Sequence, residues 1–225
     1  MILSQLNNHH IVLIILWLLY FSIHSLLASI RFKKFILNSY PGFMPWYRIS
    51  FNIIAILLII PPLFVMARYP GDIVWQWSGN WSYLANVLAL LAIAGFIWSL
   101  RSYDSTEFFG TRQLDEGRVD VTEKESFKLS VLHRYVRHPW YSLALVLIWT
   151  QDMNVAFLIS AIMLSLYFIL GSRLEENKLT AFHGDQYRLY QKQVAALIPL
   201  PWRILSKQKA EELVSLFDKK ESNND

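Results

Sequence analysis

Long apolar runs with almost no charge constrain the fold of this chain more than any other feature. A bilayer core needs about 20 apolar residues per helix, and three segments meet that length: Ile11–Ile30, Trp46–Ala67 and Trp81–Leu100. A fourth apolar stretch, Trp140–Leu170, is interrupted by the polar turn Gln151–Asn154. We interpret it as a helical hairpin, with a short helix over Trp140–Thr150 and a nearly full span over Met153–Gly171. The short helix either extends backward through Leu129–Tyr135 or enters the membrane partway.

Composition agrees with a membrane protein. Only 17% of the 225 residues are charged and 54% are hydrophobic, whereas soluble domains carry about 25% charged residues. So much apolar material excludes a disordered chain. The sequence has no cysteine, which excludes a disulfide framework, a cysteine-ligated metal centre and a cysteine nucleophile.

Basic residues are distributed with a strong sidedness. Of the 21 lysines and arginines, 20 fall on one side of the predicted spans, and only Arg68 falls on the other. The positive-inside rule makes the basic side cytoplasmic. The predicted topology is therefore five spans, with the N-terminus outside and the C-terminus inside. Met1–His10 lacks the basic region of a signal peptide, so the first span is expected to stay. The net charge of +4 belongs to this sidedness and does not indicate a nucleic-acid partner.

The predicted fold class is an all-α integral membrane protein of five transmembrane helices in three parts. Residues 1–102 hold three N-terminal spans. Residues 103–201 hold a cytoplasmic loop, the hairpin and a candidate site. Residues 202–225 form an amphipathic cytoplasmic tail whose helical spacing predicts a surface helix against the headgroups, through Trp202, Leu205, Lys209, Leu213 and Phe217.

A dense block of basic and aromatic residues, Leu132–Tyr141, stands directly before the fourth apolar stretch. One interpretation is a juxtamembrane basic anchor with an aromatic belt, since such flanks are common. However, Pro139 suits the first turn of the following helix, and it keeps His138 out of the helical region. His138 then lies at a helix N-terminus, where free amides and the helix dipole attract a carboxylate or phosphate.

Two adjacent carboxylates, Glu175 and Glu176, follow the last predicted span. At the C-terminal end of a helix they oppose the dipole, which favours cations there. Either the helix continues into water and both glutamates are solvated, or they bind a sugar diol or a ligand cation.

A short amphipathic helix is predicted after Gly184. This glycine suits a left-handed end to the preceding helix, and Asp185 suits the cap of the next one. Tyr187, Tyr190 and Val194 then share one face. Taken alone, that face indicates packing more than a binding site.

The predicted hairpin brings these three segments to one face of the membrane, although His138 and Glu175 lie 37 residues apart. A single cytoplasmic pocket would then hold an anion-binding end, a carboxylate end and aromatic faces. A zwitterionic nucleoside cofactor has parts that match all three.

The order of these motifs resembles the superfamily of isoprenylcysteine carboxyl methyltransferases and phospholipid methyltransferases, small membrane enzymes that use S-adenosylmethionine. The resemblance covers Leu132–Pro201 and rests on Arg137-His138-Pro139-x-Tyr141, Glu175-Glu176-x-x-Leu179, Gly184-x-x-Tyr187-x-x-Tyr190-x-x-x-Val194 and Ile198-Pro199. The upstream part is similar to a narrower branch, the bacterial methanethiol S-methyltransferases and NnrU-like proteins, through His24–Ser29 followed by Lys33, then Tyr47-Arg48-x-x-x-Asn52, then Phe109-Gly110-x-Arg112-Gln113.

This resemblance implies a site for S-adenosylmethionine. The implied cofactor-binding residues are Tyr135, Val136, Arg137, His138, Pro139, Tyr141, Glu175, Glu176, Tyr187 and Tyr190. The segment before the hairpin would hold the methionine and nucleoside portions. One of the two glutamates would bind the ribose hydroxyls or orient the amino group, and the two tyrosines after the hairpin would close the pocket.

Methyl transfer from a sulfonium mainly needs approach and orientation, so no catalytic side chain and no metal are expected. The acceptor would be a small thiol, a prenylated carboxylate or a lipid amine that arrives laterally from the bilayer. His24 and Ser25 are expected to line that route, although helix–helix hydrogen bonding is an equal interpretation. Arg134 is the third substrate-binding candidate, placed to balance the carboxylates or to face lipid phosphate.

The sequence departs from the superfamily pattern at Leu143, where the family usually has a glycine two residues after the motif tyrosine. A glycine would allow close backbone approach to a ligand. The departure keeps open a non-catalytic membrane protein that retains the fold. An NADPH-dependent membrane reductase is a further alternative, since sterol reductases resemble the same C-terminal architecture. A reductase would be expected to show more phosphate-binding basic residues and an asparagine in place of Trp140.

Overall fold

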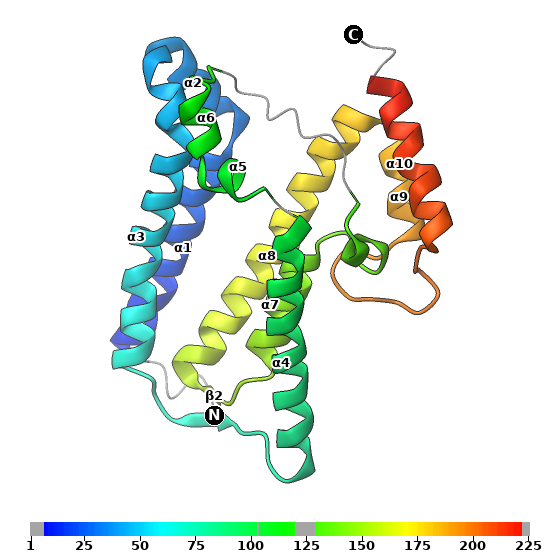
Figure 1. Ribbon diagram of the computed structural model, residues 1–225. Coiled ribbons are helices and arrows are strands. Elements are labelled where there is room, and N and C mark those ends of the chain that lie inside the picture. The colour runs from blue at the N-terminus through cyan, green and yellow to red at the C-terminus, as the bar shows by residue number, and fades with distance from the viewer. Residues whose placement is uncertain (1–6, 103, 120–128, 222–225) are drawn as a thin grey trace. The chain divides into compact units, whose positions relative to one another are not determined.

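The computed structural model describes residues 7–102, 104–119 and 129–221, and the regular structure in this part of the chain is almost entirely helical (Figure 1). The α-helices are α1 (Asn8–Ala28), α2 (Ile30–Ser39), α3 (Tyr47–Arg68), α4 (Asn80–Ser99), α5 (Ser105–Phe109), α6 (Thr111–Asp115), α7 (Pro139–Trp149), α8 (Val155–His183), α9 (Asp185–Gln193) and α10 (Lys207–Glu221). Shorter elements are the 3-10 helices η2 (Pro41–Trp46), η3 (Leu100–Ser102) and η4 (Val131–Arg134), and the strands β1 (Ile73–Trp75) and β2 (Met153–Asn154).

Among the described residues, four helices are long and apolar enough to cross a membrane: α1, α3 with the preceding η2, α4 and α8. They correspond to the first three apolar runs and to the second arm of the hairpin, and they confirm an all-α integral membrane protein. The first arm, α7, has 11 residues. At 1.5 Å per residue it reaches about 16 Å, roughly half of a hydrocarbon core. It does not extend backward, because η4 is a separate helix and α7 begins at Pro139.

The chain divides into two compact units, each built from segments that are not consecutive. Unit 1 comprises residues 1–78, 103–123 and 151–164, and unit 2 comprises residues 79–102, 124–150 and 165–225. Helix α8 therefore begins in unit 1 and ends in unit 2.

In unit 1, α1 and α3 pack side by side (Figure 1). Their apolar faces meet the start of α8 in a cluster around Leu13, Trp17 and Ala156, each at most 1% exposed. The Trp17 indole Nε1 donates a hydrogen bond of 2.9 Å to the Ser160 hydroxyl. A buried indole N–H needs such a partner, so this bond fixes the register between α1 and α8.

The polar interruption of the fourth apolar stretch, expected as a turn, contains a short strand. Strand β2 pairs antiparallel with β1, with Ile73 opposite Asn154. The Asp152 carboxylate accepts from the Trp77 amide at 2.9 Å. The Asn154 side chain accepts from the Phe157 amide at 2.9 Å and so satisfies an amide in the first turn of α8. The polar residues are thus used to satisfy backbone donors.

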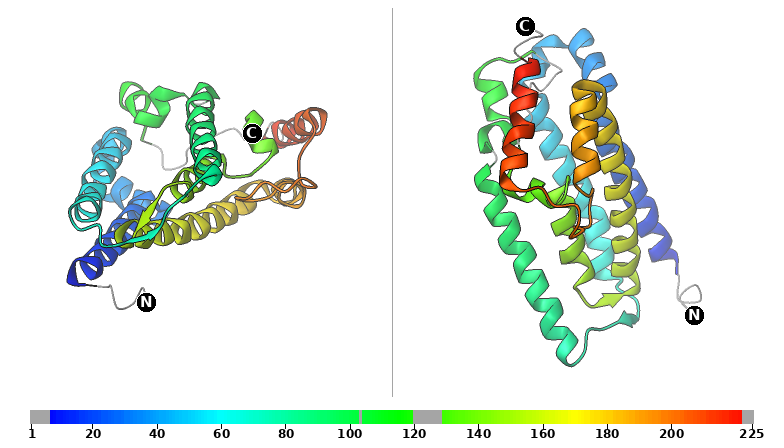
Figure 2. Two further views of the ribbon diagram at one scale, coloured as in Figure 1. Left: turned by 90° about the horizontal axis from the view of Figure 1, so that it is seen from below. Right: turned by 90° about the vertical axis from the view of Figure 1, so that its right-hand side faces the viewer.

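In unit 2, α9 and α10 lie side by side (Figure 2). They share a buried cluster made by Tyr187, Tyr190, Val194, Leu205 and Leu213. The expected tail helix starts at Lys207, so Leu205 precedes it. Leu205 and Leu213 are buried in this cluster, so the prediction that this face lies against headgroups is wrong for these two residues.

The junction between α8 and α9 also differs from the prediction in one detail. Gly184 has a φ of +65° and is itself the N-cap of α9. Asp185 is the first helical residue, and its carboxylate accepts from Arg188 Nη1 at 3.0 Å instead of capping. The positive φ that glycine supplies is what allows the chain to turn here without a side-chain cap.

Candidate functional site

An extended connection between η4 and α7 is held in place by the segment that follows α9. Val136 forms a parallel bridge with Ala195. The Arg137 amide donates to the Ala195 carbonyl at 2.8 Å, and the His138 amide donates to the Ala196 carbonyl at 3.1 Å. These bonds satisfy backbone groups that would otherwise be unpaired in a partly buried loop.

His138 occupies the N-cap position of α7, as the sequence predicted. Its φ of −122° and ψ of 74° are not helical, and Pro139 takes the first helical position. The His138 carbonyl accepts the first helix bond, from the Ser142 amide at 3.0 Å. The imidazole makes no capping bond to the helix backbone. It points to the two glutamates at the end of α8 instead.

Glu176 has its acceptor capacity filled by the protein itself. Arg137 donates from Nε and Nη2 to the two carboxylate oxygens at 2.8 and 2.9 Å. His138 Nε2 lies 3.0 Å from Oε1, and Gln191 Nε2 donates to Oε2 at 3.0 Å. The Arg137 and Glu176 side chains are 9% and 12% exposed. A carboxylate has about four acceptor sites, so Glu176 holds the site together and has little capacity left for a ligand.

Glu175 is placed differently from its neighbour. Its side chain is 50% exposed, and its Oε2 lies 3.3 Å from His138 Nδ1. In the part of the chain that the structure describes, this is the one ion pair that it makes. Glu175 is therefore the glutamate whose carboxylate can accept hydrogen bonds from a bound molecule.

His138 lies between two carboxylates, one on each ring nitrogen. Ionised carboxylates accept and do not donate, so contacts to both of them favour a ring that donates from both nitrogens, which is the imidazolium. Burial by itself lowers the pKa of His138, but the hydrogen bonds to Glu175 and Glu176 outweigh it and raise the pKa above its usual value. Burial lowers the pKa of nearby His133 to about 4, and the positive charge of His138 adds to that effect.

Three aromatic rings form a parallel column beside the carboxylates. The His138 and Tyr141 rings stack at 5.5 Å with 8° between their planes. Tyr141 in turn stacks on Phe168 of α8 at 5.1 Å and 13°. An imidazolium over a tyrosine face is also a favourable cation–π contact. The carboxylates contact the ring nitrogens of His138 and the column contacts its face, so together they fix the ring.

Arginines occupy the end of α9, where carbonyl groups lack helical partners. Arg137 Nη1 donates to the Gln191 carbonyl at 3.0 Å and also to the Val194 carbonyl. Arg203 donates to the same Gln191 carbonyl. Arg134, a substrate-binding candidate, donates from Nε to the Leu205 carbonyl at 2.9 Å. Positive charge at a helix C-terminus is also favoured by the dipole, so Arg137 and Arg203 stabilise the end of α9, whereas Arg134 binds the segment before α10.

The structure brings together five of the predicted cofactor residues in unit 2, namely Arg137, His138, Tyr141, Glu175 and Glu176. Val136 and Pro139 supply backbone, and Tyr135 is 40% exposed next to Arg134. Tyr187 and Tyr190 are each 1% exposed, and the Tyr190 hydroxyl donates to the His133 carbonyl at 2.7 Å. Both tyrosines thus support the cluster from within the core.

His24 and Ser25 belong to α1 in unit 1, where the His24 ring packs on Tyr20 and Phe51.

Comparison with curated proteins finds relatives named methanethiol S-methyltransferase. The relative from a Pseudomonas species is 31% identical over 180 residues, which cover 78% of this chain and 68% of the relative. The chain belongs to the methanethiol S-methyltransferase family. Other members, from Crocosphaera subtropica and Mycobacterium tuberculosis, are 28% and 29% identical and are covered over 69% and 74% of their lengths. No family model and no solved structure matches the chain.

The motifs that are similar to the methanethiol S-methyltransferase branch meet in unit 1. Asn52 Nδ2 donates to the carbonyls of Phe108 and Phe109 at 3.1 and 3.3 Å, and Arg48 Nε donates to the Phe108 carbonyl at 3.3 Å. Gly110 has a φ of +92°, and a Cβ there would lie 2.8 Å from Arg48 Cβ. The glycine is therefore required both by its conformation and by this close approach, which fixes α5 and α6 on α3.

Leu143 packs against α4 within unit 2. A Cβ on Gly95 would lie 3.0 Å from Leu143 Cδ2, so the glycine leaves the space that the leucine fills. Trp140, on the same helix, donates from Nε1 to the Ser99 hydroxyl at 2.9 Å. The departure from the superfamily pattern at position 143 is thus matched by a small residue on the facing helix. The carboxylate cluster forms in this chain with a leucine at position 143.

This pairing predicts the effect of filling the space. Gly95→Leu should lower the free energy of unfolding by about 1–3 kcal/mol, since extra methylene groups in a packed interface are destabilising. Leu143→Ala in the same chain should recover most of the loss, because contacting residues couple. Unfolding midpoints in mixed detergent measure both effects. Gly42→Leu, at a site with open space around it, is the control and should change the midpoint little. An unchanged midpoint for Gly95→Leu would contradict the packing.

Gln191 is one site residue that the sequence reasoning missed, and Phe168 of the aromatic column is another. Gln191 lies four residues after Tyr187, so it shares that face of α9, and this spacing was the available signal. Its carbonyl accepts hydrogen bonds from two arginines, and its side chain donates one to Glu176. Such a double role depends on tertiary contacts that no local pattern contains.

Proposed function

We propose that this protein is an S-adenosylmethionine-dependent integral membrane methyltransferase that methylates a small thiol. Membership of the methanethiol S-methyltransferase family supports the reaction and the acceptor class. The observation that carries the proposal for this chain is that its two glutamates have different surroundings. Glu176 is filled by protein donors, while Glu175 presents a half-exposed carboxylate beside an imidazolium and an aromatic column.

The residues present fit the cofactor by the chemistry of their side chains. A carboxylate such as Glu175 accepts hydrogen bonds from a ribose diol or an ammonium group. The aromatic column formed by His138, Tyr141 and Phe168 lies beside Glu175, and aromatic groups suit contact with an adenine. S-adenosylmethionine, when bound, supplies a methyl group that is already activated on a sulfonium.

The residues of this chain then bind the cofactor and orient it. Glu176 and Arg137 neutralise one another and fix the end of α8 against the connection before α7. His138 holds the Glu175 carboxylate in one orientation through its Nδ1. Such positioning is the main contribution that a displacement at an activated methyl group requires.

Calorimetric titration of the detergent-purified protein with S-adenosylhomocysteine and, in parallel, with NADPH tests the proposal. We expect binding of S-adenosylhomocysteine alone. Transfer of a labelled methyl group to methanethiol, compared with a prenylated cysteine and a phosphatidylethanolamine, then identifies the acceptor. Binding of NADPH alone would replace the proposal by the reductase, and binding of neither would leave the non-catalytic alternative.

We further propose that the N-terminus lies outside and that the site and C-terminus face the cytoplasm of the bacterial inner membrane, on the strength of the basic sidedness. Because the chain has no cysteine, single-cysteine variants report sidedness directly. Ser78→Cys should react with a membrane-impermeant maleimide in intact cells, and Ser215→Cys should react only after lysis. Both residues are exposed in the structure. The reverse labelling pattern would overturn this orientation.

A further inference from the structure

The connector between α1 and α3 is held in place by specific hydrogen bonds. Ser29 ends α1 and caps α2, since its hydroxyl donates to the Leu26 carbonyl at 2.7 Å and accepts from the Phe32 amide at 3.2 Å. The Tyr47 hydroxyl returns from the start of α3 to the Leu27 carbonyl at 2.5 Å. Because α1 and the helical segment formed by η2 and α3 are both long enough to cross a membrane, α2, which joins them, lies at a membrane surface.

Large apolar side chains on this connector are not covered by protein. Phe35, Tyr40 and Trp46 are 57%, 64% and 51% exposed. Met44, between them, is buried at 5%, so the exposure is not that of a loose loop. Exposed aromatic residues at the end of a spanning helix are typical of the boundary between headgroups and acyl chains.

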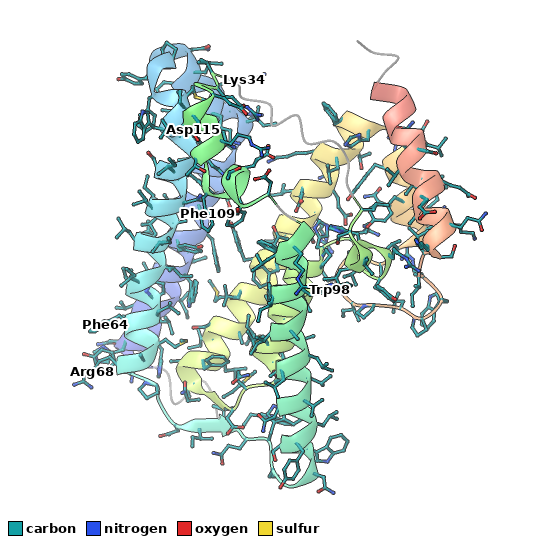
Figure 3. All side chains as sticks on the ribbon, in the orientation of Figure 1. Lys34, Phe64, Arg68, Trp98, Phe109 and Asp115 are labelled. Atoms are coloured by element: carbon teal, nitrogen blue, oxygen red, sulfur yellow. The ribbon has the colours of Figure 1, made fainter. Side chains whose placement is uncertain are left out.

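The exposed face of α2 is basic and also carries an aromatic residue. Arg31, Lys34, Phe35 and Asn38 are exposed and recur at helical spacing on one side, whereas Phe32 is only partly exposed. Within the described part of the chain, Arg31 and Lys34 form no ion pair. The sequence contains no aspartate or glutamate before Asp72. Figure 3 shows Lys34 at one end of unit 1 and Arg68 at the other.

We propose that α2 is a binding surface for the phosphate groups of anionic phospholipids, with Arg31 and Lys34 as the contacting residues and Phe35 inserted among the lipid chains. The charge of the surface and its position beside two spans carry this assignment. A basic residue at an anionic membrane surface contributes attraction that is screened by salt. The surface is independent of the glutamate site in unit 2.

The test uses the full chain in neutral detergent, titrated with phosphatidylglycerol or with phosphatidylcholine and read by native mass spectrometry. We expect wild type to bind phosphatidylglycerol more tightly than phosphatidylcholine. Arg31→Gln with Lys34→Gln should weaken phosphatidylglycerol binding by about 25-fold, from roughly one basic residue's contribution each. The control, Lys207→Gln with Lys209→Gln in α10, removes the same charge and should bind as wild type does.

Equal binding by the α2 variant and wild type would overturn the proposal, and so would an equal loss in the α10 control. Should the α2 variant not fold, hydrogen exchange of wild type in lipid nanodiscs decides. Residues 30–39 should exchange more slowly in phosphatidylglycerol than in phosphatidylcholine. Identical exchange in the two lipids would overturn the assignment.

Discussion

Glu176→Gln is expected to destabilise the protein by about 3 kcal/mol, whereas Glu175→Gln should leave stability nearly unchanged. Glutamine at position 176 leaves the Arg137 guanidinium and the His138 imidazolium without their shared counter-ion, in a place where both carboxylate oxygens are engaged. Breaking one side of a buried ion pair costs about 3–5 kcal/mol. Glu175 is half exposed, so its replacement removes a screened contact of small effect.

The ligand affinities of the same two variants should show the opposite order once folding is controlled. Glu175→Gln removes a charged acceptor for the cofactor, and a hydrogen bond to a charged group contributes about 1.5–3 kcal/mol. The dissociation constant for S-adenosylhomocysteine should therefore rise by about 10- to 100-fold. Unfolding midpoints in mixed detergent and calorimetric titration of the folded fraction measure the two quantities. A Glu175→Gln variant that binds S-adenosylhomocysteine like wild type would show that the ligand-binding carboxylate is misassigned.

Arg137→Lys provides a matched test of the geometry. Lysine keeps the charge but presents a point charge where the guanidinium makes two parallel bonds to Glu176. It also loses the bonds to the Gln191 and Val194 carbonyls. Its stability should accordingly fall toward that of Glu176→Gln, although no charge has been removed.

The meeting of His138 and Glu175 could be predicted from the sequence because it depends only on connectivity. An apolar stretch that leaves and returns must bring its two flanks to one face, and Pro139 fixes where the first helix begins. The spans could be predicted for the same reason, since length and charge alone decide them. These inferences need no knowledge of which side chains touch.

The roles of the two glutamates could not be predicted, because adjacent residues on a helix differ by about 100° in direction. Only the packing of Gln191 and Arg137 against α8 decides that Glu176 faces inward. The contact between Leu143 and Gly95 could not be predicted from the sequence for a similar reason. It joins residues 48 positions apart, and neither residue is unusual in an apolar helix.

His138 is expected to make stability fall with pH over a window that begins at about pH 6.5. Its folded pKa lies above that of the unfolded chain, because the bonds to Glu175 and Glu176 outweigh burial. Its contribution to folding is therefore fully present below about pH 6.5 and declines as pH rises through the raised pKa. His133 stays neutral across this window, since its pKa is about 4, and Arg137 stays charged.

The difference in unfolding free energy between wild type and His138→Gln isolates this contribution from other titrating groups. We expect wild type to be the more stable at pH 6.5 and the difference to shrink steadily toward pH 9. His133→Gln is the matched control. Because the pKa of His133 is lowered in the folded protein, the stability advantage of wild type over this variant should not shrink as pH rises, and any change should have the opposite sign. A difference that stays constant with pH would mean that His138 folds as a neutral imidazole. One ring nitrogen would then face a carboxylate without a proton, and the two-carboxylate arrangement could not be the source of its orientation.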